Sequence, residues 1–430
     1  MAIEDDVLVI GGGLAGATAA IAAAEGGGRV RLVSAKQSTL RHASGLIDVL
    51  GYTPAGDGPL ANPFDAIEGL AEGHPYERVG LETVREAISF FDDMTGDAYE
   101  GGHTDANALV PTAAGSIKPT ARYPASTAAG LASDDRDTLF VGFERLPDFD
   151  APLAAAHLEA AGVPFEARGV TVRFPGIARD DAKRTRYAHL LGRPETVRTE
   201  RGKATAREAL ADIVRDQLET EARVGFPAIL GDERVAEVRA DLADQLGVSV
   251  FEVPTGPPSL PGMRLEDLLF DALEDAGVRV TTGVPVIDFE HAVGDSGRID
   301  HVVVDRNGSK IPHRADQYVL ATGGLVGKGV KSERERVYEP IFDCHVSHPS
   351  DRYDWFVDDA FGDQPYPKFG LSVDRDLRPL DAVGDPEFSN LRAAGAVVGG
   401  SDFAAEKSGA GVSLATGYFA GQRAGGEGGE

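Results

Sequence analysis

The 430-residue sequence contains one cysteine, Cys344. A single thiol cannot form a disulfide within the chain, and it cannot supply the several thiolates of an iron–sulfur cluster or a structural zinc site. The sequence also has no run of about 20 apolar residues, which argues against a membrane-spanning helix, and it lacks a basic segment followed by a cleavable apolar stretch at its start. We therefore expect a cytoplasmic chain without a metal site, held at the inner face of the cell membrane only through a partner.

Lysine is scarce as well. Nine of the 42 basic residues are Lys and 33 are Arg, against 69 acidic residues, which gives a net charge of -27. An acid-rich, lysine-poor surface is typical of a protein that stays hydrated in molar salt, so the composition indicates the cytoplasm of an extreme halophile. A field of this sign repels phosphates and anionic headgroups, which argues against nucleic-acid partners and against direct adsorption on a membrane.

Glycine, in contrast, is abundant, and three glycines near the N-terminus form a dinucleotide-binding motif. Residues 6–20 read D-V-L-V-I-G-G-G-L-A-G-A-T-A-A, an apolar strand that runs into G-x-G-x-x-G and an alanine-rich helix. In this motif Gly11 permits the tight turn, Gly13 allows a pyrophosphate to approach the backbone, and Gly16 allows close packing of helix and strand. The helix N-terminus supplies free N–H groups for the phosphates.

The second strand, R-V-R-L-V-S, ends at Ser34, where dinucleotide-binding proteins usually carry an acid for the adenosine ribose. A hydroxyl forms a weaker hydrogen bond to the ribose than a carboxylate does. This departure favours a cofactor that is held at many points, or one that lacks the adenosine.

The remaining pattern predicts an α/β protein with a Rossmann-like FAD/NAD(P)-binding domain and an inserted α/β cap domain. We assign residues 1–95, 254–335 and 385–430 to the first domain, and residues 96–253 and 336–384 to the second, which faces substrate or a partner. Short apolar strands at 138–143, 165–174, 226–230 and 249–253 alternate with helical segments, which indicates a second parallel sheet.

Three glycine-flanked strand ends, in this order along the chain, are typical of a two-domain flavoprotein. They are the N-terminal motif, the segment A-T-G-G at 321–324, and A-A-G-A-V-V-G-G-S-D at 393–402 with the helix that starts near Gly409. A helix N-terminus aimed at the isoalloxazine stabilises the negative charge of the reduced flavin. The predicted cofactor-binding residues are Gly11, Gly13, Leu14, Ala15, Gly16, Ser34, Ser38, His42, Ser44, Gly45, Thr322, Gly323, Gly324, Gly400, Ser401, Gly409, Gly411 and Val412.

Several further segments together resemble the B subunit of anaerobic glycerol-3-phosphate dehydrogenase, within the fumarate-reductase-like flavoproteins. They include S-T-L-R-H-A-S-G-L-I-D at 38–48, N-A-L-V-P-T-A-A-G-S-I-K-P-T at 107–120, and V-P-T-G-P-P-S-L-P-G-M-R-L at 253–265, which is the most specific. The likeness covers nearly the whole chain.

The resemblance implies a complex in which glycerol 3-phosphate is oxidised to dihydroxyacetone phosphate and electrons pass through the iron–sulfur C subunit to quinone. It implies that the main substrate-oxidising flavin lies in the A subunit and that the B subunit is itself a flavin protein, usually with FMN. The G-x-G-x-x-G motif favours a pyrophosphate and hence FAD, with FMN as the alternative. The competing interpretations are a self-sufficient flavin dehydrogenase and a non-catalytic bridging subunit.

Candidate catalytic groups are few. His345 and His348, in D-C-H-V-S-H-P-S, are the residue type that most often removes a proton from an alcohol, although surface histidines are the competing interpretation. Arg264 follows the proline-stiffened turn that also carries Thr255 and Ser259, and this turn is expected either to cover the flavin or simply to start a helix.

A phosphate substrate needs cations. Residues 183–203 hold seven basic residues against Glu195 and Glu200. Arg184 and Arg186 in this stretch, with Arg122, are the predicted contacts for a substrate anion or for an acidic partner protein, and we expect docking more than phosphate capture because the charges are spread over several turns. Arg352 is a lesser candidate.

Overall fold

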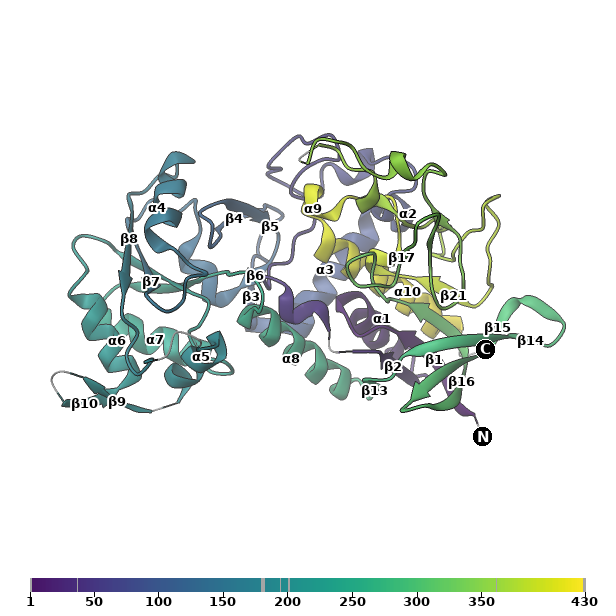
Figure 1. Cartoon of the computed structure of the whole chain (residues 1–430), viewed down its shortest axis with the longest axis horizontal. Coiled ribbons are helices and arrows are strands. Elements are labelled where there is room, and N and C mark those ends of the chain that lie inside the picture. The colour runs from purple at the N-terminus through teal and green to yellow at the C-terminus, as the bar shows by residue number, and fades with distance from the viewer. Residues whose placement is uncertain are drawn as a thin grey trace. The chain divides into compact units, whose positions relative to one another are not determined.

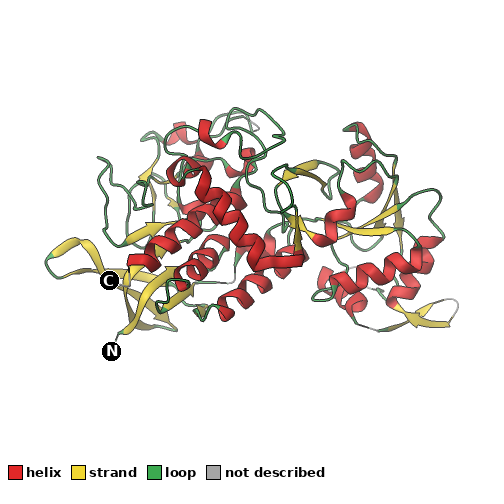
Figure 2. Ribbon diagram, turned by 180° about the vertical axis from the view of Figure 1, so that it is seen from behind, coloured by secondary structure: helices red, strands yellow, loops and turns green. Residues whose placement is uncertain are grey.

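The computed structural model describes residues 2–36, 38–178, 182–193, 195–199, 202–360 and 362–427. Its contacts divide the chain into two compact units. Unit 1 contains Met1–Thr39, Asp48–Gly96 and Asp267–Glu430, and unit 2 contains Leu40–Ile47 and Asp97–Glu266. Figure 1 shows the elements with their labels, and Figure 2 shows the helices and strands from behind.

Unit 1 is built on a seven-stranded mixed sheet. Its strand order is β13 (Arg279–Thr282), β2 (Val30–Ser34), β1 (Ile3–Ile10), β16 (Ser309–Leu320), β15 (Asp295–Arg306) and β14 (Val286–Ala292), and β21 (Leu391–Ala393) also pairs with β16. The pairs among β13, β2, β1, β16 and β21 are parallel, whereas β14, β15 and β16 form an antiparallel meander. Parallel strands place their carboxyl ends at one edge, so this edge is where a ligand is expected.

Two helices from opposite ends of the sequence pack together in unit 1. They are α1 (Leu14–Ala24), purple in Figure 1, and α10 (Gly409–Glu427), yellow in Figure 1. Gly417, Gly421 and Gly425 of α10 lie so close to α1 that a Cβ atom on each would come within 2.3 to 2.6 Å of a carbonyl oxygen of Ala15, Ala19 or Ala23. The small residues at four-residue spacing therefore allow backbone-to-backbone contact of the two helices.

The rest of unit 1 consists of helices and short strands. The helices are α2 (Pro75–Val79), α3 (Leu81–Thr95) and α9 (Phe403–Glu406), and the short strands are β17 (Lys331–Ser332), β18 (Val337–Tyr338), β19 (Val346–Ser347) and β20 (Gly370–Leu371). Strand β17 pairs with β18, and β19 pairs with β20, both antiparallel. Among the described residues, no helix combines the length and the apolar character needed to cross a bilayer.

Unit 2 contains the second parallel sheet that the sequence predicts. Its strand order is β12 (Ser249–Val253), β11 (Arg223–Pro227), β7 (Thr138–Phe143) and β8 (Ala167–Val172), with all three pairs parallel. Its helices are α4 (Ala151–Ala160), α5 (Arg184–Gly192), α6 (Ala206–Arg215) and α7 (Val235–Leu246). Helix α6 begins with a complete capping box between Thr205 and Glu208.

Antiparallel strand pairs complete unit 2. They are β3 (Tyr99–Glu100) with β6 (Tyr123–Pro124), β4 (Ala108–Pro111) with β5 (Ile117–Thr120), and β9 (Thr196–Thr199) with β10 (Gly202–Thr205). Helix α8 (Leu260–Asp275) starts in unit 2 and ends in unit 1.

The compact units differ from the expected domain boundaries at three segments, besides a one-residue shift at Gly96. Residues 40–47, expected in the flavin-binding domain, cluster with unit 2. Residues 336–384, expected in the inserted domain, cluster with unit 1, because Leu371 of β20 forms a parallel bridge to Val398. Residues 254–266, expected in the flavin-binding domain, cluster with unit 2, because the Ser259 N–H donates to the Arg41 carbonyl at 2.9 Å. Whether the units are also the functional domains stays a prediction.

Candidate cofactor site

The carboxyl edge of the parallel strands in unit 1 brings the three glycine segments together. The Ala321 N–H donates to the Ile10 carbonyl at 2.8 Å, and the Ala394 N–H donates to the Leu320 carbonyl at 2.9 Å. The C-terminal end of β16 therefore lies between the ends of β1 and β21 and is hydrogen-bonded to both. The Gly395 N–H then donates to Thr416 Oγ1 of α10 at 2.8 Å, which ties the last strand to the last helix.

The three glycines of the N-terminal motif differ in their surroundings. Gly11 has φ 118°, and a Cβ there would lie 2.2 Å from the Ala321 carbonyl oxygen. At Gly16 a Cβ would lie 1.9 Å from the Gly11 carbonyl oxygen. At Gly13 a Cβ would meet no atom within 4 Å. Gly11 thus allows the turn after β1, and Gly16 allows α1 to pack closely against that turn. The space beside Gly13 is open.

Helix α1 begins at this open space with unused donors. Its N-cap, Gly13, provides no side-chain cap, and its first turn holds no acidic residue. Within the described part of the chain, no acceptor is found for the backbone N–H groups of residues 12–16. Free N–H groups and the positive end of the helix dipole together favour an anion, and a pyrophosphate fits this arrangement.

A second unused polar group lies at the end of β16. Thr322 Oγ1 is buried and has no hydrogen-bond partner among the described residues. The following Gly323 has φ 82°, and a Cβ on Gly324 would lie 2.6 Å from the Ala396 carbonyl oxygen. Buried hydroxyl groups are nearly always hydrogen-bonded in native proteins, so an unpaired one beside the predicted cofactor segment fits a ligand contact.

Ser34 ends β2 as predicted, and its side chain is buried. Its hydroxyl donates to the Lys36 carbonyl at 2.7 Å, and a Cβ on Gly12 would lie 3.2 Å from the Ser34 Cβ. Gly12 and Ser34 are therefore adjacent, as a ribose site after β2 requires, although the hydroxyl proton already has an acceptor. A ribose contact through the Ser34 oxygen stays a prediction.

The predicted segment at 400–412 packs tightly against its own chain. A Cβ on Gly400 would lie 2.4 Å from the Gly73 carbonyl oxygen, and one on Gly411 would lie 2.2 Å from the Tyr76 hydroxyl oxygen. The Gly411 N–H donates to the Asp48 carbonyl at 2.7 Å, and the Val412 N–H donates to the Ser408 carbonyl at 2.8 Å. These two donors are used by the protein, so Gly409 and the buried Ser401 are the remaining candidates there.

A buried polar cluster that the sequence did not predict fixes this segment. His74 Nδ1 accepts from the Tyr76 N–H at 3.1 Å, so its Nε2 is the donor to the Glu406 carboxylate, also at 3.1 Å. Glu406 further accepts from the Ser408 hydroxyl at 3.0 Å. Burial raises the pKa of Glu406, but its bonds with His74 and with the Asp402 N–H outweigh burial and lower the pKa below its ordinary value. Residues 74 and 406 are too far apart in sequence for any pattern to signal this pair.

Among the predicted loop contacts, Ser38 is buried in unit 1, whereas His42, Ser44 and Gly45 belong to unit 2. His42 is exposed, and Ser44 Oγ accepts from the Leu46 N–H at 3.3 Å. Gly45 has φ 79°, and its carbonyl accepts from the Tyr99 hydroxyl at 2.8 Å. For Ser44 and Gly45 the structure thus shows loop-stabilising contacts, and cofactor contact by these residues stays a prediction.

The predicted cationic residues of unit 2 hold the unit itself together. Arg264 binds the fully buried Glu252 carboxylate with two N–H groups, at 2.6 and 3.0 Å, and also donates to the carbonyls of residues 231 and 232. Arg184 is buried and binds Asp148 at 2.7 Å and the carbonyls of Gly256 and Pro258. Salt bridges of this kind leave few donors for a substrate. Arg264 as a catalytic residue is therefore unsupported by its geometry.

The other predicted anion contacts are also engaged. Arg186 forms an exposed bidentate pair with Glu195 at 3.0 and 3.1 Å, and the buried Arg122 donates to the Ala121 carbonyl at 3.0 Å. Glu200 and Arg201 lie outside the described residues. Within residues 183–203, Arg184 and Arg186 are thus already paired with carboxylates of the same chain.

The two candidate catalytic histidines differ in their surroundings. His345 is exposed, and its backbone N–H donates to Glu387 at 2.7 Å. His348 is half-buried, its Nε2 accepts from the Val337 N–H at 3.4 Å, and its Nδ1 lies 2.7 Å from the Val346 carbonyl. Both ring nitrogens of His348 are therefore occupied, which leaves His345 as the accessible one of the pair. A catalytic role for either stays a prediction.

A buried acid in the same segment was missed. Glu339 is fully buried, and its carboxylate accepts from the N–H groups of Ile341 at 2.9 Å and Phe342 at 2.7 Å. Burial raises the pKa of Glu339 to about 7, although the backbone hydrogen bonds act in the opposite direction. The E-P-I-F-D-C segment carries no alternation or motif that would have singled out this residue.

The raised pKa of Glu339 has a consequence for stability. An acid with a raised folded-state pKa stabilises the fold fully below its unfolded pKa, and this contribution is lost as the pH rises through the folded value. The window here runs from about pH 4.5 to about 7. We expect the free energy of unfolding to fall by about 3 kcal/mol across this window because of Glu339, on the scale of about 1.4 kcal/mol for each pKa unit.

Denaturant titrations in molar KCl at several pH values measure this effect. In the Glu339→Gln variant the part of the fall in unfolding free energy that is due to Glu339 should be absent. The exposed Glu335→Gln control should keep it. An unchanged pH dependence in the Glu339 variant contradicts the expectation.

The geometry, an open and uncapped helix N-terminus at the edge of a parallel sheet, is typical of a nucleotide-binding protein, and the comparison with protein families identifies the class as FAD-binding. Residues 6–412 match the family described as FAD binding domain. The cofactor of this chain is FAD, and the protein is a flavin oxidoreductase.

Relatives with closely similar sequences narrow the class. The chain is 62% identical over 424 residues to the probable B subunit of the anaerobic glycerol-3-phosphate dehydrogenase of Halobacterium salinarum, covering 99% of this chain and 98% of that protein. It is 32% identical to the B subunit of the corresponding enzyme of Pectobacterium atrosepticum, covering 95% and 96%. The chain therefore belongs to the family of B subunits of anaerobic glycerol-3-phosphate dehydrogenase, as its sequence motifs predict.

Solved structures are more distant. A 3-ketosteroid-Δ4-(5α)-dehydrogenase from Rhodococcus jostii aligns over 100% of this chain and 97% of its own length, with a TM-score of 0.40 and 14% identity. The open conformation of a flavocytochrome c3 fumarate reductase aligns over 100% and 79%, with a TM-score of 0.39 and 12% identity. At such low TM-scores and identities we draw no conclusion from these two structures.

Proposed function

We propose that this chain is the flavin-containing subunit of a respiratory glycerol-3-phosphate dehydrogenase complex. The complex oxidises sn-glycerol 3-phosphate to dihydroxyacetone phosphate and passes the electrons through an iron–sulfur subunit to quinone. The observation that carries this proposal is the 62% identity over nearly the whole chain with a protein named as part of that dehydrogenase.

The FAD would be held at the carboxyl edge of the unit 1 sheet. The N–H groups of Gly13, Leu14, Ala15 and Gly16 would bind the pyrophosphate, and Thr322 Oγ1 would donate to or accept from the ligand. Bound FAD supplies a two-electron acceptor that can return electrons one at a time. The free N–H groups at α1 support a pyrophosphate, and hence FAD over FMN.

The partners we propose are the catalytic flavoprotein, or A subunit, and the iron–sulfur protein, or C subunit. With one cysteine, buried in this chain, any cluster in the path has to be carried by another polypeptide. The complex would lie at the cytoplasmic face of the cell membrane, with contact to the lipid made by a partner.

A second role within the same complex is favoured by the polar contacts described above. Arg122, Arg184, Arg186 and Arg264 all have partners inside unit 2, and both ring nitrogens of His348 are occupied. These contacts leave His345 as the only accessible member of the predicted catalytic set, among the residues described. In this second role the chain relays electrons from the substrate-oxidising flavoprotein.

A visible absorption spectrum of the purified chain in molar KCl tests the proposal, followed by mass identification of the released chromophore. We expect a yellow protein with about one FAD per chain, no turnover of glycerol 3-phosphate with a dye acceptor by the chain alone, and turnover once the partner subunits are added. Turnover by the chain alone would instead indicate a self-sufficient dehydrogenase. A protein that stays colourless after reconstitution with FAD and FMN would refute the proposal and indicate a bridging role.

A further inference from the structure

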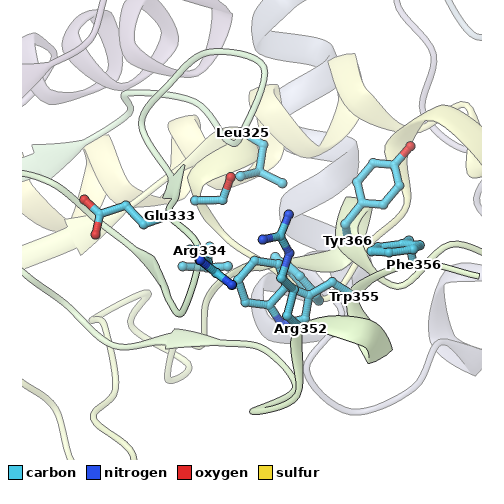
Figure 3. A pocket seen from close by; sticks show the side chains of 10 residues that line it. Leu325, Glu333, Arg334, Arg352, Trp355, Phe356 and Tyr366 are labelled. Atoms are coloured by element: carbon cyan, nitrogen blue, oxygen red, sulfur yellow. The ribbon is translucent and has the colours of Figure 1, made fainter.

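Unit 1 also contains a pocket whose lining includes none of the predicted cofactor-binding residues. Its volume is about 540 Å³, and its lining comes from Leu325, from the β17–β18 hairpin, from Arg352, Trp355 and Phe356, and from Tyr366 and Phe369. Figure 3 shows the side chains that surround it. We call the five residues Arg334, Arg352, Trp355, Phe356 and Tyr366 the arginine–aromatic patch.

Both arginines of the patch are exposed and have no carboxylate partner among the residues that the structure describes. Arg334 lies at the tip of the β17–β18 hairpin, which is closed by a bond from the Glu333 N–H to the Arg336 carbonyl at 2.8 Å. The carboxylate of Glu333 is occupied by the Tyr338 hydroxyl at 3.0 Å and by Arg336 at 3.4 Å. In Figure 3 it points away from the other labelled side chains.

The two arginines of the patch lie without a carboxylate in a protein whose net charge is -27. Several other arginines of unit 1 are paired, such as Arg29 with Asp6 at 2.7 Å and Arg378 with Asp374 at 2.8 Å. Two guanidinium groups that line one pocket without a carboxylate are positioned for acceptors that come from outside the chain.

Two of the three aromatic members of the patch are exposed. Phe356 is 46% exposed and Tyr366 is 47% exposed, and both line the pocket. Trp355 and Phe369, which also line it, are buried and pack edge to face with ring centroids 6.3 Å apart. Trp, Tyr and Arg are the residue types that carry most of the binding energy in protein interfaces, and they are most effective around a partly buried centre.

The loop that presents these aromatics is held by its own hydrogen bonds. The Trp355 Nε1–H donates to the Pro349 carbonyl at 2.8 Å, and Asp351 caps the short helix of Arg352–Trp355 by accepting from the Tyr353 N–H at 2.9 Å. Gln364 accepts from the Val357 N–H at 3.0 Å and donates to the Asp359 carbonyl at 2.6 Å. A surface ordered before binding loses less entropy when a partner docks.

His348 supports the floor of the same pocket. Its ring lies 5.6 Å from the Trp355 ring and 6.1 Å from the Phe369 ring, measured between centroids. With both ring nitrogens bonded to backbone, the imidazole fixes the position of Trp355 in the pocket. The geometry thus gives His348 a positioning role in the patch.

We propose that the arginine–aromatic patch is the docking site for a segment of another subunit, and that this segment places an apolar side chain in the pocket and carboxylates against Arg334 and Arg352. This inference rests on the proposed assembly into a complex. Two acid-rich chains repel each other unless one offers a local cationic surface. The patch is such a surface, and it combines charge with apolar area.

A protein segment suits the patch better than a small anion does. At 1 M salt the Debye length is only about 3 Å, so exposed arginines hold a free phosphate weakly. Burial of aromatic surface does not depend on charge in this way, and bidentate arginine–carboxylate bonds add orientation. In the molar salt that the composition indicates, a stable contact needs both the buried aromatic surface and the arginine–carboxylate bonds.

The test uses the full chain co-expressed with the other subunits of the proposed complex and purified in molar KCl. The first variant carries Arg334→Glu and Arg352→Glu, and the second carries Phe356→Ser and Tyr366→Ser. For each, we expect the dissociation constant of the complex to rise at least about 100-fold, with the FAD content of the chain unchanged. The matched control carries Val293→Ser in the β14–β15 turn and Arg306→Glu at the end of β15, both exposed, and it should assemble as the wild type does.

Three results would overturn the inference, and they can be told apart. If the wild-type subunits form the complex and both patch variants assemble with equal affinity, the docking site is elsewhere and the proposed function stands. If the purified wild-type chain binds none of the subunits, the inference fails together with the proposed assembly. If the isolated chain is a dimer that the patch variants dissociate, the occupant is a second copy of this chain and the proposed occupant is wrong.

Discussion

Replacing Gly13 with aspartate is expected to weaken FAD binding strongly while leaving the fold intact. Gly13 is the N-cap of α1 with φ -84° and ψ -172°, a conformation open to any residue, and a Cβ there meets no atom within 4 Å. Aspartate is a favourable N-cap, so the stability of the FAD-free chain should stay within about 0.5 kcal/mol of the wild type. The added carboxylate occupies the place of the pyrophosphate.

The size of the expected loss follows from the charges. Two like charges about 4 Å apart repel by about 4 kcal/mol at an effective dielectric constant of about 20, so we expect the affinity for FAD to fall at least about 100-fold. Flavin fluorescence titration in molar KCl measures it. Gly13→Asn is the matched control, because it has nearly the same size and capping ability without the charge, and it should bind FAD more tightly than Gly13→Asp. Full FAD occupancy of the aspartate variant would place the pyrophosphate elsewhere.

Replacing Gly421 with leucine is expected to destabilise the chain severely. A Cβ at this position would lie 2.3 Å from the Ala19 carbonyl oxygen, and backbone atoms of a packed helix cannot withdraw locally. Helices α1 and α10 would have to separate along their contact. We expect a loss of at least about 3 kcal/mol in the free energy of unfolding, measured by denaturant titration of the FAD-free protein.

The same helix offers a graded series and a control. Gly421→Ala should lose less than Gly421→Leu, because the higher helix propensity of alanine, about 1 kcal/mol, offsets part of the clash. Gly426→Leu, also on α10, should be neutral or slightly stabilising, because a Cβ at Gly426 meets no atom within 4 Å. If Gly421→Leu is as stable as Gly426→Leu, the close contact between α1 and α10 is wrong.

The parts of the fold that could be predicted are those with a strong local pattern. The apolar run Thr138–Phe143 becomes β7 with the same bounds, and the strand before Gly11 becomes β1. The antiparallel pairing of the strands after β13 was not predicted, although the sequence carries a signal for it. Asn307 and Gly308 both have positive φ, 55° and 86°, in the turn between β15 and β16, and an Asn-Gly pair between two strands is typical of such a hairpin.

The irregular segment 336–384 clusters with unit 1, and not with the inserted domain as predicted, for a physical reason. Its strands are only two residues long, too short for any periodicity, and they are placed by long-range bridges such as that from Leu371 to Val398. Sequence pattern describes local preference, whereas these bridges depend on the finished sheet.

The candidate site divides in a similar way. The turn at Gly11 and the close packing at Gly16 could be predicted from the glycine spacing, and both are present in the structure. The partners of Arg264, Arg184 and His348 could not be predicted, because a charged or ring side chain in a sequence gives no indication of whether its donors will be used internally. Sequence reasoning finds the residue types that chemistry needs and overestimates how many of them are free.

The contact between α1 and α10 also has a consequence for the biogenesis of the protein. Ala15 and Gly417 touch although about 400 residues separate them, so the helix that would grip the diphosphate lacks its neighbour until translation is almost finished. Loading of the prosthetic group should therefore follow release from the ribosome, and nascent chains arrested before residue 409 should not retain it.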